Sequence, residues 1–308
     1  MSTPGSASSS AAEVTAALRA TGYICDERVA VAVFLAERLG RPLLVEGPAG
    51  VGKTELARSA AQARGRELVR LQCYEGLDEA KALYEWDYAK QMLYTQLVRS
   101  ALDKTTAAAP TVEAAMGAVA ASEASFFDRR FLLARPLLKA LESDQPVVLL
   151  VDEVDRADPE FEAFLLEILA EMQITIPEVG TIRAKHTPLV ILTSNGTRDM
   201  TDALRRRCLH AFVDYPAPER EIEILSSRVP GIDAALAASL AAFVGRVRKL
   251  DLKKAPSVGE TIDWARALIV LGRSQLDAEL VRDTLGVILK HQDDREAVGA
   301  RVKDLLAG

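Results

Sequence analysis

The sequence has few cysteines and no long apolar run. Its three cysteines, Cys25, Cys73 and Cys208, lie far apart, are odd in number and lack the close spacing of metal ligands. A reduced, cytoplasmic setting is therefore expected. No stretch approaches the roughly 18 consecutive apolar residues that a membrane-spanning helix needs, so no transmembrane segment is expected.

Basic residues are fewer than acidic residues. The 38 Lys and Arg side chains are outnumbered by 44 Asp and Glu side chains, which leaves a net charge of −6. This balance argues against a general nucleic-acid or membrane surface, although it leaves room for a local basic groove. Residues 1–12 are small and polar and lack the basic start and apolar run of a signal peptide. We expect a disordered tail there.

What the chain does contain is a complete phosphate-loop motif, G-x-x-x-x-G-K-[ST]. The motif consists of Gly47, Pro48, Ala49, Gly50, Val51, Gly52, Lys53 and Thr54. Glycines let the backbone fold closely around a triphosphate, and the helix that follows adds its positive end. We expect Lys53 to reach the β- and γ-phosphates and Thr54 to offer its hydroxyl to Mg²⁺. A strand-like run at residues 42–46 and a helical run at residues 53–64 provide the required setting.

A second candidate site element follows the continuous apolar run at residues 147–151. Such a run is typical of a strand buried on both faces of a parallel sheet, and ligands bind at the carboxyl ends of such strands. Asp152 and Glu153 stand at that end. We expect Asp152 to order the Mg²⁺ and Glu153 to polarise the attacking water. The alternative is that the two carboxylates only begin the next turn.

The next apolar strand pattern, at residues 189–194, ends in Asn195. A neutral hydrogen-bonding side chain at that edge can hold the attacking water without taking its proton. Further on, Arg205, Arg206 and Arg207 end a short helical pattern. Three consecutive arginines usually form a solvated surface, and the alternative is that they enter the site of a neighbouring subunit and offset transition-state charge.

The rest of the chain divides into recognisable patterns. Strands are predicted at residues 67–72 and 210–214, and a β-hairpin at residues 173–184. Residues 74–100 read as helix-rich with many aromatic side chains, forming either core or a partly exposed contact surface. Residues 103–122 are rich in Ala and Thr and read as a loop with a weak helix.

Taken in order, the phosphate loop, the acidic pair, the asparagine and the arginine cluster resemble an AAA+ ATPase. The resemblance implies ATP and Mg²⁺ as cofactors and an α/β fold. That fold is an αβα sandwich with a five-stranded parallel sheet and an all-α C-terminal lid. It has a β-hairpin insert before the sensor strand, which is the strand at residues 189–194 that ends in Asn195. We expect the core at residues 13–216, with inserts near residues 73–125 and 173–188, and the helical lid at residues 217–308.

Within AAA+ proteins the chain is similar to the MoxR family, and most similar to the CoxD-type subgroup that assists carbon monoxide dehydrogenase maturation. The resemblance rests on residues 70–78, 84–91 and 260–265 and on the hairpin before the sensor strand. It implies a homo-oligomeric ring, usually of six subunits, with ATP between protomers. Arg206 and Arg207 match the fingers that act in trans, and Arg205 matches less well.

The implied function is an ATP-hydrolysing chaperone that remodels a metalloenzyme client, of the molybdenum–copper carbon monoxide dehydrogenase type, so that its metal cluster can be completed. Family members often work with a partner that carries a von Willebrand factor A domain. Two other functions stay open. One is a nucleotide-gated scaffold with slow hydrolysis, and the other is a nucleic-acid-stimulated motor, against which the net charge argues.

The sequence leaves two roles open, that of Tyr23 and that of the arginine that senses the γ-phosphate. Tyr23 lies in the segment that lines the adenine pocket in ATPases of this layout, but plain core packing explains it equally well. Family relatives often carry a γ-phosphate-sensing arginine near the start of a lid helix. Gly259 stands at the matching position, and Arg266, two turns further on, is either its substitute or a surface residue.

Overall fold

The computed structural model describes residues 10–94, 96, 111, 128–177 and 179–307. Its strands are β1 Leu43–Glu46, β2 Leu68–Gln72, β3 Tyr84–Trp86, β4 Leu132–Ala134, β5 Val148–Asp152, β6 Gln173–Ile176, β7 Gly180–Arg183, β8 Leu189–Ser194 and β9 Leu209–Phe212. The N-terminal part contains helices α1 Ala11–Ala20, α2 Glu27–Leu39, α3 Lys53–Arg64, α4 Glu79–Ala82, α7 Pro136–Glu142, α8 Pro159–Glu171 and α9 Asp202–Arg207, with 3-10 turns η1 Arg129–Phe131 and η2 Val154–Arg156. The C-terminal part contains α10 Pro218–Arg228, α11 Ala234–Val247, α12 Val258–Val270, α13 Ala278–Ile288, α14 Gln292–Ala300 and α15 Val302–Ala307.

Five strands form one parallel sheet in the order β2-β5-β8-β1-β9. The strands β5, which carries Asp152, and β8, which precedes Asn195, are neighbours in the interior of this sheet and are buried along their whole length. Because all five strands run in the same direction, their carboxyl ends meet at one edge, where α/β proteins bind ligands. At that edge the phosphate loop follows β1, Asp152 ends β5 and Asn195 follows β8.

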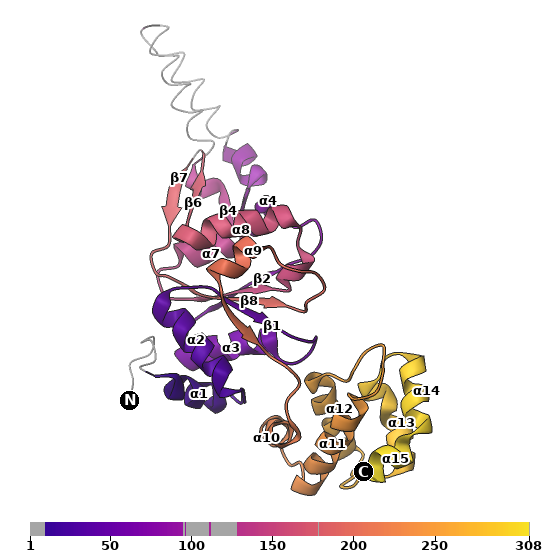
Figure 1. The fold of residues 1–308 in the computed structure, drawn as a ribbon. Helices are drawn as coiled ribbons and strands as arrows, with labels where there is room; N and C mark the ends of the chain where they lie inside the picture. The colour runs from indigo at the N-terminus through magenta and orange to yellow at the C-terminus, as the bar shows by residue number, and fades with distance from the viewer. Residues whose placement is uncertain (1–9, 95, 97–110, 112–127, 178, 308) are drawn as a thin grey trace.

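Alternate residues of each central strand face different hydrophobic cores. On one face, Leu43 and Val45 of β1 pack with α1, α2 and α3, and on the other, Leu44 packs in the core that contains α7 and α8. Figure 1 shows these helices on opposite sides of the sheet. The predicted αβα sandwich with a five-stranded parallel sheet is therefore confirmed.

The C-terminal helices α10 to α15 surround a hydrophobic core of their own, centred on Trp264 and Phe243. Trp264 is fully buried, and its indole N–H donates to the Thr284 hydroxyl at 2.8 Å, so its polar atom is satisfied. Figure 1 shows this helical part joined to the sheet through the strand β9 and the segment after it. The prediction of an all-helical C-terminal region is confirmed.

Local capping explains where the helices next to the site begin and end. The Asp26 carboxylate accepts the N–H of Arg28 at 3.1 Å and starts α2, while Gly40 ends it in the left-handed conformation. Ser257 and Glu260 form a reciprocal capping box at the start of α12. These caps fix α2 and α12, which lie on two sides of the candidate site.

The insert after β2 differs from its sequence interpretation. The predicted helix-rich segment at residues 74–100 contains the short helix α4 and a helical stretch at residues 88–94, but β3 lies between them and pairs antiparallel with β4. The partner strand lies almost fifty residues downstream, so no local pattern could indicate the pairing. Residues 103–122 lie mostly outside the described residues.

Two further boundaries differ slightly. Helix α1 begins at Ala11, capped by the Ser10 side chain, inside the stretch assigned to a tail, and β9 spans Leu209–Phe212 and not residues 210–214. The hairpin β6-β7 precedes the strand β8 as expected, with Ile174 paired to Ile182. Across the ranges that the structure describes, no helix is both long and apolar enough to cross a membrane.

Candidate active site

The phosphate loop connects β1 to α3 and depends on three glycines with positive φ, namely Gly47, Gly50 and Gly52. A Cβ on Gly47 would lie 1.9 Å from the Val213 carbonyl oxygen, and one on Gly50 would lie 2.2 Å from the Ser257 Cβ. Such distances are far shorter than any real contact, so the backbone approach here requires glycine. The motif glycines therefore serve both the loop conformation and its contact with the C-terminal helices.

Lys53 begins α3 and points back into the loop. Its Nζ donates to the carbonyl oxygens of Gly47 and Pro48, both at 2.7 Å, and to Asn195 Oδ1 at 2.9 Å. Burial lowers the pKa of the Lys53 ammonium, while the carboxylates of Asp155, Asp152 and Glu153 oppose that shift. An anionic phosphate entering the loop would compete with neutral acceptors for these three N–H groups, and it is the stronger partner.

Asp152 ends β5 and is almost fully buried. Its Oδ1 accepts the hydroxyls of Thr54 at 2.8 Å and Thr193 at 2.6 Å, and its Oδ2 accepts the guanidinium of Arg70 at 2.6 Å. Asp152 and Thr54 are expected from the sequence to share a metal, and the structure brings their oxygens together. The contacts of Asp152 with Thr193 of β8 and Arg70 of β2 were not predicted from the sequence.

Glu153 follows Asp152 with φ 55°, an uncommon left-handed conformation for a residue other than glycine. Its N–H donates to the Thr193 hydroxyl at 2.9 Å, which fixes the turn. The carboxylate accepts Gln72 Nε2 and Arg156 Nη1, both at 3.0 Å, and Asn195 Nδ2 at 3.4 Å. Backbone strain of this kind concentrates at functional sites, and here it aims the carboxylate toward Asn195.

The Asn195 side chain lies between the other two functional groups, with its oxygen on Lys53 and its nitrogen on Glu153. Its backbone N–H donates to Asp155 Oδ2 at 3.2 Å, and the N–H and hydroxyl of Thr197 donate to the same oxygen. Burial raises the pKa of Asp155, but these hydrogen bonds outweigh it and hold the pKa below its usual value. Asp155 is thus a charged anchor for the turn that carries Asn195.

Arg70 and Gln72 form a small group on the edge strand β2 that restrains both carboxylates. Arg70 contacts Asp152 and also donates to the Gln72 side chain, and Gln72 in turn donates to Glu153. The alternating polar positions at the end of the predicted strand were a usable signal. What was missing was the sheet order, because β2 lies beside β5 although about 75 residues separate them.

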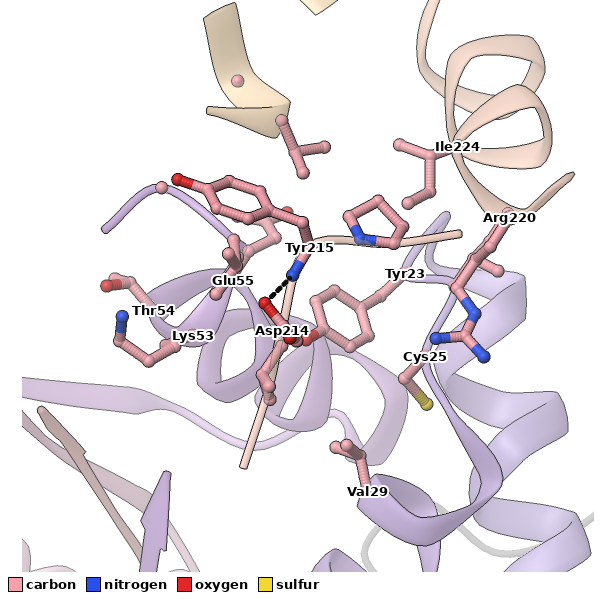
Figure 2. A pocket seen from close by; sticks show the side chains of 18 of the residues that line it. Tyr23, Cys25, Val29, Lys53, Thr54, Glu55, Asp214, Tyr215, Arg220 and Ile224 are labelled. Atoms are coloured by element: carbon pink, nitrogen blue, oxygen red, sulfur yellow. Dashed lines mark hydrogen bonds between the residues drawn. The ribbon is translucent and has the colours of Figure 1, made fainter. Parts of the chain in front are cut away.

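These residues open onto a cavity of about 940 Å³ between the sheet edge and the C-terminal helices. Its apolar lining includes Tyr23, Val29 and Ile224. In the view of Figure 2 these three side chains lie to the right of Lys53, with Tyr23 near the middle. The Tyr23 ring is nearly buried, and its Cε2 lies 3.6 Å from where a Gly52 Cβ would be. Tyr23 therefore both lines the cavity and packs against the phosphate loop, so neither interpretation of it is discarded.

The C-terminal helices close the cavity from the other side. Val258 at the start of α12 donates its N–H to the Gly50 carbonyl at 3.2 Å, and Gly259 lies beside it without a side chain. Arg266 lies two turns further along α12, where it donates to Asp263 and to the Arg228 carbonyl. The start of α12 therefore carries no arginine, in agreement with the sequence, where Gly259 stands at the position at which family relatives often carry one.

The three consecutive arginines do not line this cavity. Arg205 donates to Glu46 at 3.0 Å, and His210 contacts the same carboxylate. The side chains of Arg206 and Arg207 are exposed, and their carbonyls accept hydrogen bonds from Arg41. The structure thus separates Arg205, which is bound within its own chain, from the other two.

A family model described as an AAA domain of the dynein-related subfamily matches residues 42–208, more than half of the chain. The chain belongs to this AAA family. The matched range contains the phosphate loop, Asp152, Glu153 and Asn195. As a member of the family, the protein is an ATPase.

Two curated relatives are each named "Chaperone protein ClpB 2". The one from Thermosynechococcus vestitus is 28% identical over 185 residues, covering 57% of this chain and 17% of its own length. The one from Parasynechococcus marenigrum is 30% identical over 149 residues, covering 48% of this chain and 13% of its own. The match thus spans less than a fifth of either relative.

Among solved structures, the Thermotoga maritima RuvB Holliday junction branch migration motor aligns with a TM-score of 0.45 at 16% identity, over 85% of this chain and 67% of that chain.

The donor set of this AAA chain fits a nucleotide and Mg²⁺. The Thr54 hydroxyl and the Asp152 carboxylate present hard oxygen atoms 2.8 Å apart, the ligands that Mg²⁺ prefers, and two side chains suffice when phosphates and waters complete its shell. Among the described residues no cluster of three or more His, Cys, Asp or Glu forms a metal site. At Gly47 and Gly50 of the loop beside Lys53, a side chain would collide with Val213 and Ser257, so only glycine fits there.

Proposed function

We propose that this AAA chain hydrolyses ATP at the carboxyl edge of its sheet and uses the resulting movement to remodel a protein client. The observation that carries the proposal is the convergence of Lys53, Thr54, Asp152, Glu153 and Asn195 at one edge. They come from three separate segments of the sequence, at residues 53–54, 152–153 and 195. Each has the chemistry that one step of phosphoryl transfer to water requires.

Each residue has a distinct role in this proposal. Lys53 holds the terminal phosphates, and Thr54 with Asp152 holds Mg²⁺, which neutralises charge on the phosphate oxygens. Glu153 accepts a proton from the attacking water at its carboxylate, and Asn195 orients that water without competing for the proton. The helices above Gly50 exclude bulk water from the cavity. Tyr23 and the apolar lining around it receive the base.

The site is completed by a second copy of the chain in this proposal. AAA proteins commonly form oligomeric rings, and the resemblance to MoxR proteins implies six subunits. Arg206 and Arg207 are exposed and lie away from their own chain's cavity, which suits residues that serve a neighbour. Arg205 is tied to Glu46 and suits a structural role.

For the client we propose a metalloenzyme whose metal cluster needs an opened protein to be completed, of the molybdenum–copper carbon monoxide dehydrogenase type. The support is the CoxD-like character of residues 70–78, 84–91 and 260–265 and the hairpin β6-β7. A partner with a von Willebrand factor A domain belongs to the same proposal. The similarity to two proteins named as chaperones is consistent with remodelling.

Capture of the client tests this function. A Glu153→Gln chain that binds ATP without hydrolysing it should retain an incompletely metallated enzyme from a native extract, and Lys53→Ala, which cannot hold ATP, should not. Metal analysis of the retained enzyme gives its state. If cells that carry only Glu153→Gln complete the client's metal site at the normal rate, hydrolysis has no part in the function.

One observation favours a second candidate, a nucleotide-gated scaffold with slow hydrolysis. Arg70 donates to the Asp152 carboxylate and Gln72 to the Glu153 carboxylate. The proposed general base, Glu153, is therefore restrained by its own chain before a nucleotide binds. In a scaffold, ATP binding alone suffices. Lys53→Ala would then abolish client maturation, while Glu153→Gln would leave it intact.

A further inference from the structure

An ion pair joins the C-terminal helices to the first turn of α3. Arg228, the last residue of α10, donates Nη2 to Glu55 Oε1 at 2.7 Å and Nε to the Gly22 carbonyl at 3.0 Å. Glu55 directly follows Thr54, and both members of the pair line the 940 Å³ cavity. Their side chains are about one-third exposed, so the pair is open to a ligand.

We propose that Arg228 is a nucleotide-binding residue, which exchanges the Glu55 carboxylate for the phosphate nearest the sugar. This inference rests on the nucleotide site proposed above. An arginine fork matches the oxygens of a phosphate and binds them with two parallel hydrogen bonds. The Arg228 guanidinium keeps an anionic partner throughout, because a phosphate replaces the Glu55 carboxylate.

The position of Arg228 selects this part of the nucleotide. Its guanidinium bridges Glu55, the residue after Thr54, and Gly22, the residue before Tyr23. In the nucleotide site proposed above, Lys53 and Thr54 hold the terminal phosphates and Tyr23 receives the base. A nucleotide that fills both ends must pass its sugar and first phosphate between them. Arg228 and Glu55 border that passage.

The other lid arginines around the cavity have different partners. Arg266 donates to Asp263 and to a carbonyl, and Arg220 pairs with Asp26 at 3.0 Å. Gly259 has no side chain to offer. Among these positions of the lid, Arg228 is the one whose partner is a carboxylate in the phosphate-loop helix, where a phosphate can displace it.

Two substitutions should act in opposite directions. Arg228→Gln should weaken the binding of ADP by about tenfold or more, because a charge-assisted hydrogen bond is lost. Glu55→Gln should tighten it by about threefold, because the competing carboxylate and its repulsion of phosphate are removed. The same factors should apply to a non-hydrolysable ATP analogue, because the phosphate nearest the sugar is common to both nucleotides. The measurement is equilibrium binding of a fluorescent ADP and of the analogue in Mg²⁺, together with the unfolding temperature of each chain without nucleotide.

Arg19→Gln is the matched control. It removes another ion pair between α10 and the N-terminal helices, with Glu223 at 2.8 Å, outside the cavity, and it should leave both affinities unchanged. If Arg228→Gln and Glu55→Gln weaken binding alike, the pair only braces the lid and the inference is overturned. Weakening confined to the ATP analogue would assign Arg228 to the terminal phosphate and overturn it as well. A wild-type chain that binds no ADP would instead reject the nucleotide site itself.

Discussion

Replacing Glu153 by Gln is expected to lower ATP turnover by about a hundredfold or more while leaving ATP affinity within a few fold of wild type. A general base contributes about 10²- to 10⁴-fold, and an amide cannot accept the proton. Glutamine keeps the size of the side chain, and its amide oxygen can still accept one of the two hydrogen bonds that Gln72 and Asn195 donate to Glu153. The left-handed backbone at this position suits both residues equally, so folding should be preserved.

Phosphate release under saturating ATP and Mg²⁺ measures the turnover, and binding of a fluorescent nucleotide measures the affinity. Glu160→Gln, an exposed carboxylate in the first turn of α8, is the matched control and should turn over normally. Unchanged turnover in Glu153→Gln would remove this carboxylate from the reaction. The restraint by Gln72 would then be a structural contact without a catalytic meaning.

The second large effect concerns the exposed arginines. An arginine that enters the neighbouring site contributes about 10³-fold or more to turnover, so the double variant Arg206→Ala, Arg207→Ala should be nearly inactive while still binding ATP. Arg205→Ala removes a side chain that is bound to Glu46 of its own chain and should be far less harmful to turnover.

Mixing two inactive variants distinguishes an arginine that acts in a neighbouring subunit's site from one that acts in the site of its own chain. The double arginine variant and Lys53→Ala are each inactive alone, but a mixed ring contains some sites with an intact Lys53 from one copy and intact arginines from the next. Turnover should therefore reappear when the two are combined. Failure to recover activity in rings shown to be mixed, or full activity in a strictly monomeric wild-type sample, would contradict the proposal that the arginines act in trans.

Local patterns predicted much of this fold because the physics behind them is local. The buried runs that became β5 and β8, the loop glycines before Lys53 and the capping residue Asp26 all act over a few neighbouring residues. Once these strands are known to be parallel, Asp152 and Asn195 must meet at one edge. That is why the core of the candidate site followed from the sequence.

The remaining contacts depend on the spatial order of distant segments. Arg70 reaches Asp152 because β2 adopts a place beside β5, and β3 exists because β4 lies almost fifty residues later to pair with it. Arg228 meets Glu55 across 173 positions of sequence. The local spacing of apolar residues carries no information about such distant pairings. The helix-rich interpretation of residues 74–100 was therefore wrong where β3 forms.

The central claim is that the phosphate loop around Lys53 binds an adenine nucleotide, and calorimetric titration with ADP in Mg²⁺ tests it most directly. The account predicts saturable binding to the wild-type chain with one site per chain. It predicts a loss of at least tenfold in affinity for Lys53→Ala, because the buried ammonium is the charge that holds the phosphates. Absence of binding to the folded wild-type chain, or equal affinity in Lys53→Ala, would contradict it.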